Sequence, residues 1–566
     1  MNIENLENLE NLENLENLEN PEKQENLENP ENPENDLEKV DNLIIGAGPA
    51  GLQLGYFFNK YNIPYLILER SQNCGSFFNT FPHTRELISI NKRFTGSENK
   101  DFNLRHDWNS LLNDEDFLFK NYSNEFYPHA NDLVKYLNDF KEKFNVNVRF
   151  NTNVKIIDKI NKDEFNYKVS TDNKIYICKK LIIATGLHEP SKSFNNLPKS
   201  VKHYADYEKN YFLKQENLKK YENKTILIFG GGNAGYELAD HLTNYCKTIH
   251  IHESEKKNHS IMTHYSGGLR SKYYKFLDTF YLKSLNAITK SNIKTVNKDM
   301  AITEYGGKYV VHSPNGNTSV FGSTKLSKYD DIILCTGWKF NTSIFNFQIN
   351  LTSNNKFPTT TNNYESNQYK QLYFIGALMH SKDQGRGSGG FIHGFRYLIH
   401  TFVRLNYKIP YVTNEIPFDK KLDCYNKLKN KILYRVNNSS SLYQMYGVLA
   451  DMFYFDEAQK NIIYIEDILV NEIEQIAKKL QINYFSIIYL KYRDKKENSL
   501  FKMDEFQPND PLFIHPEIKT FTFHNKHSNF ITQTYIFQED LIASFDSEKF
   551  VNMLSSILKA CNLIIK

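Results

Sequence analysis

Two glycine-rich turns of the same pattern occur in this chain of 566 residues, at residues 46–51 and 230–235. Each has the spacing G-x-G-x-x-G and lies between a predicted strand and a predicted helix. In each unit an acidic residue, Glu69 or Glu253, ends the next apolar run. Such glycines let backbone approach a pyrophosphate at a helix N-terminus, and the carboxylate accepts hydrogen bonds from ribose hydroxyls. Two intact copies therefore predict two bound dinucleotides.

Two further places in the chain support a pair of nucleotide domains. A strand that ends in Thr-Gly precedes each predicted domain crossing, at residues 185–186 and 336–337. These positions are typical of the connections between an FAD-binding domain and an inserted nicotinamide domain. The candidate cofactor-binding residues are Gly46, Gly48, Pro49, Ala50, Gly51, Glu69, Arg70, Ser76, Thr185, Gly186, Gly230, Gly232, Asn233, Ala234, Gly235, Glu253, Gly337, Gly376, Gly390 and Phe391. The predicted cofactors are FAD and either NADH or NADPH.

A glycine-rich loop at residues 383–390 is followed by a predicted helix over 391–405. The N-terminus of such a helix faces the pyrimidine edge of a flavin, where it stabilises the negative charge that reduction brings. The alternative is an ordinary surface loop.

The sequence leaves the choice between NADH and NADPH open. Glu253 favours NADH, because a carboxylate at that place accepts a free 2′-hydroxyl and repels a 2′-phosphate. Lys256 and Lys257 follow closely and could reverse that preference.

The predicted fold class is α/β: a flavoprotein with two dinucleotide-binding domains, the NAD(P) domain being inserted in the FAD domain, plus an appended C-terminal α/β domain. The predicted boundaries are 1–38 for a disordered, acidic, low-complexity leader, 39–200 and 341–405 for the FAD-binding domain, 201–340 for the NAD(P)-binding domain and 406–566 for the C-terminal domain. Within the last, the pattern predicts two helices over 419–455, strands at 484–492, 518–523 and 531–537, and a helix near 548–558.

Composition excludes several classes of protein. The net charge is +3, and lysines are scattered among asparagines instead of forming a basic patch, so no nucleic-acid partner is expected. No apolar run is long enough for a transmembrane segment. The six cysteines lie far apart without a C-x-x-C pair, which argues against a disulfide framework and a metal site. Without a visible signal peptide or retention tail, the cytoplasm is the default location.

Three longer segments are distinctive: residues 75–112, 383–397 (DQGRGSGGFIHGFRY) and 441–453 (SLYQMYGVLADMF). Through them the chain resembles the FAD-dependent oxidoreductase domain-containing protein 2 family, the endoplasmic reticulum flavoproteins associated with degradation, from about residue 40 to at least 455. That family is related to the flavin-containing monooxygenases. The resemblance implies bound FAD, a part in delivering non-native proteins to degradation, and the endoplasmic reticulum lumen as the alternative location.

The resemblance also bears on where electrons leave the flavin. A disulfide relay needs a cysteine pair, and Cys74 has no partner close in sequence, so we expect it to be a small buried residue. In the related monooxygenases an asparagine followed by lysine lies beside the flavin, and Asn91 with Lys92 is similar. Asn91 is therefore the candidate catalytic residue; alternatively, Asn91 and Arg93 only brace the loop over FAD. The phenylalanine–glycine–histidine signature of the monooxygenases is incomplete, with only His203 present.

Two functions follow. The first is an FAD-dependent NAD(P)H oxidoreductase, monooxygenase-like, that acts on a small molecule or a protein thiol. The alternative is a flavoprotein adaptor that binds non-native proteins through its C-terminal domain and helps deliver them to degradation. Steady consumption of the nicotinamide coenzyme distinguishes the enzyme from the adaptor.

Overall fold

A computed structural model of the protein describes residues 37–162, 164–191, 197–252, 288–290, 301–305, 307–312, 328–383, 387–417, 421–491, 514–522, 531–536 and 552. Apart from Leu37, these residues belong to one compact unit, Glu38–Lys566. The predicted leader, apart from residues 37 and 38, and nearly all of the predicted helix near 548–558 lie outside the described residues.

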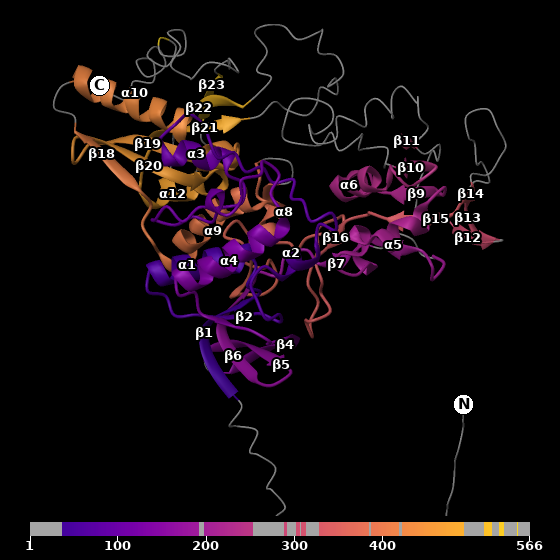
Figure 1. Ribbon diagram of the computed structural model, residues 1–566. Helices are drawn as coiled ribbons and strands as arrows, with labels where there is room; N and C mark the ends of the chain where they lie inside the picture. Colours follow the sequence, from indigo (N-terminus) through magenta and orange to yellow (C-terminus); the bar gives the residue numbers. More distant parts are fainter. Residues whose placement is uncertain are drawn as a thin grey trace, which may run out of the picture. The chain divides into compact units, whose positions relative to one another are not determined.

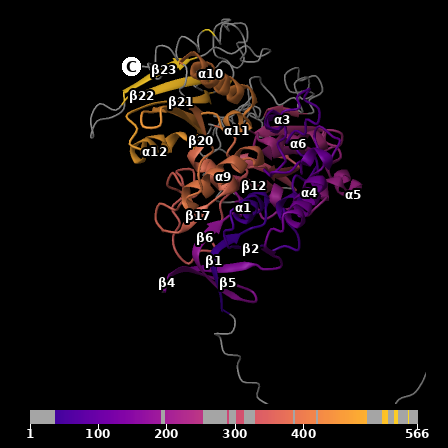
Figure 2. The same cartoon turned by 90° about the vertical axis from the view of Figure 1, so that its left-hand side faces the viewer.

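The first sheet has seven strands in the order β3-β2-β1-β6-β5-β4, with β17 paired to β6. They are β1 (Leu37–Ile45), β2 (Leu66–Leu68), β3 (Val148–Arg149), β4 (Val154–Lys162), β5 (Phe165–Thr171), β6 (Ile175–Ile183) and β17 (Leu372–Phe374). The pairs β1–β2, β2–β3 and β6–β17 are parallel, whereas β4, β5 and β6 form an antiparallel meander. Helices α1 (Pro49–Lys60), α4 (Ala130–Lys143) and α9 (Ile392–Tyr407) cover one face of this sheet (Figure 1, Figure 2).

Helix α1 begins where the first glycine turn ends. Gly48 is its N-cap and Pro49 its first residue, a position that suits proline because the missing N–H would have no partner there. Its residues from Ala50 to Phe58 are all buried, because α1 packs against both α4 and α9. A helix that is buried on all sides presents no polar stripe, which is consistent with its place inside the fold.

The second sheet contains the second glycine turn. Its order is β11-β10-β9-β15-β8, and every neighbouring pair is parallel. The elements are β8 (Lys202–His203), β9 (Thr225–Phe229), β10 (Thr248–His252), β11 (Ile288–Lys290), β15 (Asp331–Leu334) and the helix α6 (Asn233–Leu242). A small antiparallel sheet follows, of β12 (Ala301–Tyr305), β13 (Lys308–His312) and β14 (Lys328–Tyr329). Strand β9 is the strand predicted directly before the second glycine turn, and it is thus confirmed.

The carboxyl of Asp331, at the start of β15, is expected to make the stability of the folded protein depend on pH. Burial raises the pKa of its carboxyl to about 6, from about 3.9 in an unfolded chain. Because the pKa of Asp331 is higher in the folded than in the unfolded chain, deprotonation destabilises the folded state. The contribution of the protonated carboxyl to stability is fully present below about pH 4 and is lost as the pH rises through about 6. We expect Asp331→Asn to stabilise the protein by about 1–2 kcal/mol at pH 7 and hardly at pH 4, after allowance for partial exposure of the side chain. Thermal unfolding at both pH values measures this, and an equal effect at both would contradict it.

The third sheet belongs to the C-terminal part of the chain and is antiparallel, in the order β18-β20-β19-β21-β22-β23. Its strands are β18 (Thr413–Pro417), β19 (Leu449–Asp456), β20 (Asn461–Leu469), β21 (Tyr484–Lys491), β22 (His515–Thr522) and β23 (Ile531–Ile536), and its helices are α10 (Lys421–Asn438), α11 (Ser440–Gln444) and α12 (Ile473–Lys479). The strands predicted at 484–492, 518–523 and 531–537 are confirmed.

The helices predicted over 419–455 are wrong in their last part, because residues 449–456 form the strand β19. Helix α11 ends at Gln444, and Gly447 follows with a φ of 69°, a left-handed conformation that favours glycine. The first five residues of β19, 449–453, are all buried, so the alternation that marks a half-exposed strand is missing. Such a short apolar run cannot be told from a buried helix by its pattern alone.

The apolar core beneath α1 and α9 continues into the C-terminal domain. A single cluster of buried side chains includes Phe57 of α1, Phe402 of α9, Leu442 of α11 and Phe453 of β19. The C-terminal domain, which follows the other two in sequence, therefore shares a core with the FAD-type domain, and that core links the two physically.

Candidate cofactor site

The first glycine turn packs tightly on one side and is open on the other. Gly46 has a φ of 106°, and its N–H donates a hydrogen bond to the carbonyl oxygen of Leu68 at 2.8 Å. A Cβ on Gly51 would lie 2.0 Å from the Gly46 carbonyl oxygen, so only glycine fits there. A Cβ on Gly48 would meet no atom of the described residues within 4 Å. The turn therefore leaves space beside Gly48, at the start of α1.

Helix α1 directs its N-terminus at that space. No side chain caps the helix, and its first turn contains no acidic residue. The first backbone N–H groups of a helix have no partner within the helix, and together with the helix dipole they attract an anion. The residues present therefore fit a pyrophosphate beside Gly48, Pro49 and Ala50.

Glu69 directly follows β2 and has 4% of its surface exposed. Its carboxylate accepts a hydrogen bond from the N–H of Ala47 at 2.8 Å and another from the N–H of Ser71 at 3.0 Å. Each carboxylate oxygen has a second lone pair, so the group can also accept hydrogen bonds from two ribose hydroxyls. Its neighbour Arg70 is exposed, at the edge of the site.

Segments that are far apart in sequence meet at the first turn. Gly75, just before α2 (Ser76–Thr80), donates its N–H to the Ala47 carbonyl oxygen at 3.1 Å, which brings Ser76 to the turn. A Cβ on Gly46 would lie 3.4 Å from Cα of Thr185, and one on Gly376 would lie 2.4 Å from Cβ of Ala50. Gly186, next to Thr185, has a φ of 65°. The predicted residues of these segments thus converge on the start of α1.

The second glycine turn repeats the geometry of the first. Gly230 has a φ of 118°, and its N–H donates to the carbonyl oxygen of His252 at 2.9 Å. A Cβ on Gly235 would lie 2.0 Å from the Gly230 carbonyl oxygen, the same distance as in the first turn. Gly232 again faces space that no atom of the described residues occupies within 4 Å. The turn fits a second pyrophosphate at the start of α6, where Asn233 and Ala234 lie. Glu253 lies outside the described residues.

The two predicted connections between the domains lie side by side. The strands β7 (Glu189–Pro190) and β16 (Trp338–Lys339) follow the two Thr-Gly endings and pair in antiparallel fashion. Gly337, just before β16, has a φ of 83°. The Trp338 ring packs against Phe81 of the first domain, with ring centroids 4.9 Å apart, and against His203 of the second, at 5.7 Å. An aromatic contact thus bridges the two nucleotide domains.

The third predicted segment ends at the N-terminus of α9. The helix begins at Ile392, one residue later than predicted, with Phe391 as N-cap and no side chain capping it. The Phe391 ring is 40% exposed and stacks on His393, with centroids 5.6 Å apart. Gly390 packs against the ring of His380, where a Cβ would come within 3.2 Å. This uncapped helix N-terminus fits the predicted place of the flavin pyrimidine edge.

Asn91 is buried and braces a neighbouring loop. Its Nδ2 donates to the carbonyl oxygens of Ser123, at 2.9 Å, and Glu125, at 3.2 Å. Its Oδ1 is buried without a hydrogen-bond partner among the described residues. These contacts correspond to the bracing alternative, and a direct role of Asn91 at the flavin stays a prediction.

One pair of residues near the α9 N-terminus was not predicted from the sequence. Asp383 is 3% exposed; it lies 2.5 Å from Nδ1 of His380 and accepts a hydrogen bond from the Gly389 N–H at 2.9 Å. Burial raises the pKa of the Asp383 carboxyl, and His380 lowers it in part. The sequence pattern that could have indicated this pair is the spacing His-x-x-Asp directly before a glycine-rich loop. That spacing places both side chains on one face of a helical turn.

The cysteines do not form a relay within the described part of the chain. Cys74 has no exposed surface, as predicted, and burial raises the pKa of its thiol to about 12. A thiol with that pKa is not a nucleophile at neutral pH. The five cysteines at positions 74, 178, 246, 335 and 424 are all free.

The described residues contain neither a membrane-spanning helix nor a metal-binding cluster. None of their helices combines the length and the apolar character that crossing a membrane requires. Their histidine, cysteine, aspartate and glutamate side chains nowhere form a cluster of three or more suited to hold a metal ion.

Comparison with known proteins identifies the family of this chain. Residues 43–376 match the family described as pyridine nucleotide-disulphide oxidoreductase. The chain is 34% identical to the FAD-dependent oxidoreductase domain-containing protein 2 of Mus musculus, over 77% of this chain and 67% of that protein. It is 32% identical to the protein of the same name in Danio rerio, with the same coverage. The probable indole-3-pyruvate monooxygenase YUCCA1 of Arabidopsis thaliana is 27% identical over 37% of this chain and 46% of that protein.

The fold and the two glycine turns define a flavoprotein oxidoreductase with two dinucleotide-binding domains. The chain belongs to the pyridine nucleotide-disulphide oxidoreductases and, within them, to the family of FAD-dependent oxidoreductase domain-containing protein 2. The resemblance inferred from its motifs is thereby confirmed. Membership implies FAD and a nicotinamide dinucleotide as the cofactors.

Proposed function

We propose that this protein is an FAD-dependent oxidoreductase whose flavin is reduced by NADH or NADPH, and that it passes the electrons to oxygen in a monooxygenase-like reaction. One observation carries the proposal. Both glycine turns have the same close contact behind the helix, at Gly51 and Gly235, and the same open space in front of it, at Gly48 and Gly232. Retention of both geometries in one chain is expected if both dinucleotides are used.

The residues of the first domain would hold FAD. The N-terminus of α1 beside Gly48 would bind the pyrophosphate, and Glu69 would orient the adenosine ribose through its hydroxyls. A bound flavin supplies hydride chemistry, because it accepts a hydride from reduced nicotinamide and passes the electrons on. The uncapped start of α9, at Phe391, would stabilise the negative charge that collects on that side of the site.

The second domain would bring the coenzyme to the first. The start of α6 beside Gly232 would bind its pyrophosphate, and Glu253 would favour NADH by accepting a hydrogen bond from the 2′-hydroxyl. The aromatic contact of Trp338 with Phe81 would hold the two nucleotide domains in contact with each other.

Oxygen is favoured over a thiol as the next electron acceptor for two reasons. The described cysteines form no pair, and the buried thiol of Cys74, with a pKa of about 12, stays protonated. The partial identity to a plant protein named as a probable monooxygenase points in the same direction. The substrate class we propose is a small molecule that reaches the flavin.

Anaerobic reduction of the purified yellow protein tests the proposal. We expect NADH to bleach the flavin faster than NADPH, and readmitted air to restore the colour with consumption of oxygen. A flavin that neither coenzyme bleaches would contradict the enzyme and favour the adaptor. A protein that cannot be loaded with FAD would contradict the assignment of the first glycine turn.

A further inference from the structure

The C-terminal domain touches the loop that begins α9. The N–H of Ser388 donates a hydrogen bond to the carbonyl oxygen of Gln444 at 2.8 Å, and both residues are buried. Gly387 precedes it with a φ of 64°, and a Cβ there would lie 3.1 Å from Cα of Met445. The loop over residues 387–390 is therefore held against the end of α11 by a backbone contact and by close packing.

The side chain of Gln444 holds a second segment. Its Nε2 donates to the carbonyl oxygen of Arg105, the penultimate residue of α3 (Lys100–His106), at 2.6 Å. The Arg105 guanidinium donates in return to the carbonyl oxygens of Val436, at 2.7 Å, and Ser439, at 3.1 Å. A single buried glutamine thus joins α3 to the loop in front of α9.

The segment after α3 lies directly on α9. Arg396, in the second turn of α9, has no exposed surface and donates to carbonyl oxygens that include those of Leu104 and Ser110, both at 2.7 Å. The Trp108 ring stacks on His393 in the first turn of α9, with centroids 4.6 Å apart. The start of α9 is therefore positioned by residues 104–110, which Gln444 holds from the other side.

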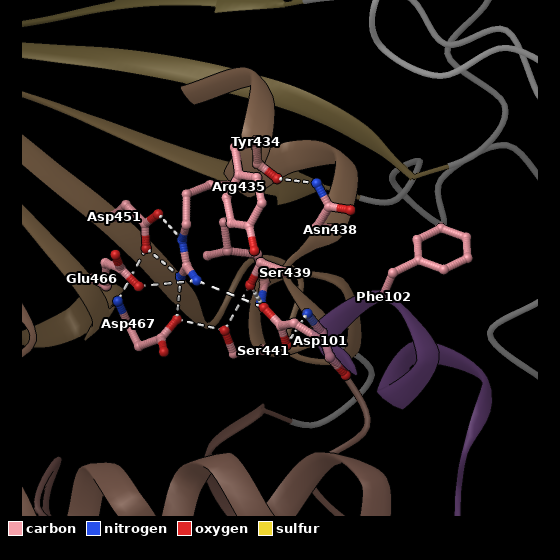
Figure 3. Close-up of polar contacts among 12 residues, drawn as sticks. Asp101, Phe102, Tyr434, Arg435, Asn438, Ser439, Ser441, Asp451, Glu466 and Asp467 are labelled. Carbon is pink, nitrogen blue, oxygen red and sulfur yellow. Dashed lines mark hydrogen bonds and ion pairs between the residues drawn. The ribbon is translucent and has the colours of Figure 1, made fainter. Parts of the chain in front are cut away.

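A buried charge cluster fixes α11 in turn (Figure 3). Arg435 of α10 is 5% exposed; its Nε lies 2.6 Å from Oδ2 of Asp451, and its Nη2 lies 2.6 Å from Oδ1 of Asp467. Asp101 of α3 accepts a hydrogen bond from the N–H of Ser440, the first residue of α11, at 3.0 Å. A buried arginine with several carboxylates holds one geometry, because any displacement leaves a charge without a partner.

From these contacts we infer that the C-terminal domain is part of the flavin site, and that Gln444 is a positioning residue that sets the affinity for FAD. The inference rests on the proposed function, because it takes the loop over residues 387–390 and the start of α9 to face the flavin. Any partner that displaced α11 would then weaken flavin binding without touching the flavin itself.

The variant Gln444→Ala tests the role of the side chain. Loss of one buried hydrogen bond at the positioning contact is expected to weaken FAD binding about five- to tenfold. FAD is titrated into the apoprotein of the full chain, and the quenching of flavin fluorescence reports the dissociation constant. Gln459→Ala is the matched control, because Gln459 is an exposed glutamine in the turn between β19 and β20 of the same domain. We expect that control to bind FAD as the unaltered protein does.

A second pair of variants tests the backbone contact. Gly387→Ala forces a Cβ against Met445, whereas Gly307→Ala has the same kind of positive φ, 71°, but meets no atom of the described residues within 4 Å. We expect only Gly387→Ala to weaken FAD binding, with the far-ultraviolet circular dichroism of both unchanged. The inference is overturned if Gln444→Ala and Gly387→Ala both bind FAD as tightly as the unaltered protein. If the unaltered protein itself binds no FAD, the proposed function fails first.

Discussion

The variant Gly48→Ala is expected to fold as the unaltered protein does and to bind FAD about 5- to 150-fold more weakly, the equivalent of about 1–3 kcal/mol of overpacking. The reason is the space in front of the glycine. An added Cβ meets no atom of the described residues within 4 Å, so the protein itself is not strained. The same Cβ would occupy the place where the pyrophosphate must approach the backbone.

The FAD dissociation constant and the thermal midpoint of the apoprotein together measure this effect. Gly51→Ala is the informative comparison, because its Cβ would lie 2.0 Å from the Gly46 carbonyl oxygen and the turn itself must shift. We expect Gly51→Ala to lower the thermal midpoint and Gly48→Ala to leave it unchanged. Normal FAD affinity in Gly48→Ala would mean that the pyrophosphate binds elsewhere.

The variant Gly232→Ala is expected to keep its FAD and to lose efficient reduction by the nicotinamide coenzyme. Its Cβ also points into open space, but beside α6 in the second domain. The coenzyme concentration for half-maximal bleaching should rise about 5- to 150-fold, again the equivalent of about 1–3 kcal/mol, while the yellow colour is retained.

Stopped-flow bleaching under anaerobic conditions measures that concentration. Gly48→Ala and Gly232→Ala serve as controls for each other, because each places a methyl group at the same point of an equivalent turn. Loss of FAD from Gly232→Ala, with normal FAD in Gly48→Ala, would show that the two turns have been assigned to the wrong cofactors.

The contacts around Gln444 change how the C-terminal domain is to be regarded. From the sequence it is an appended domain for partner binding or for covering the flavin domain. In the structure it shares an apolar core with α1 and α9, accepts a hydrogen bond from Ser388 in the loop before α9, and donates one to the carbonyl oxygen of Arg105 in α3. Removing residues 406–566 would therefore expose the core around Phe57 and Phe402, which favours a single cooperative unit over an independent module.

Much of the site was predictable because it depends on local chain geometry. Gly46 is needed for its positive φ, and Gly51 is needed because a side chain there would collide with the Gly46 carbonyl oxygen. Both needs arise within one turn, so the spacing of the glycines in the sequence indicates the turn. The strand–turn–helix pattern around each turn and the helix after residue 391 follow from local apolar patterns for the same reason. The family resemblance also came from contiguous strings, which need no knowledge of the fold.

The remaining features were decided by tertiary structure. The side-chain amide of Asn91 donates a hydrogen bond to the loop at residues 123–125, and the N–H of Ser388 donates one to the carbonyl oxygen of Gln444. Both contacts exist only because folding brings segments together that are distant in sequence. The apolar run of β19 has a pattern that also suits a helix. Only its pairing with β20 on one side and β21 on the other accounts for its burial as a strand. The sequence by itself thus indicated two dinucleotide-binding turns, since each turn is a local structure. Only the tertiary structure showed that a third domain contacts α3 and the loop before α9, because contacts between remote segments leave no local pattern.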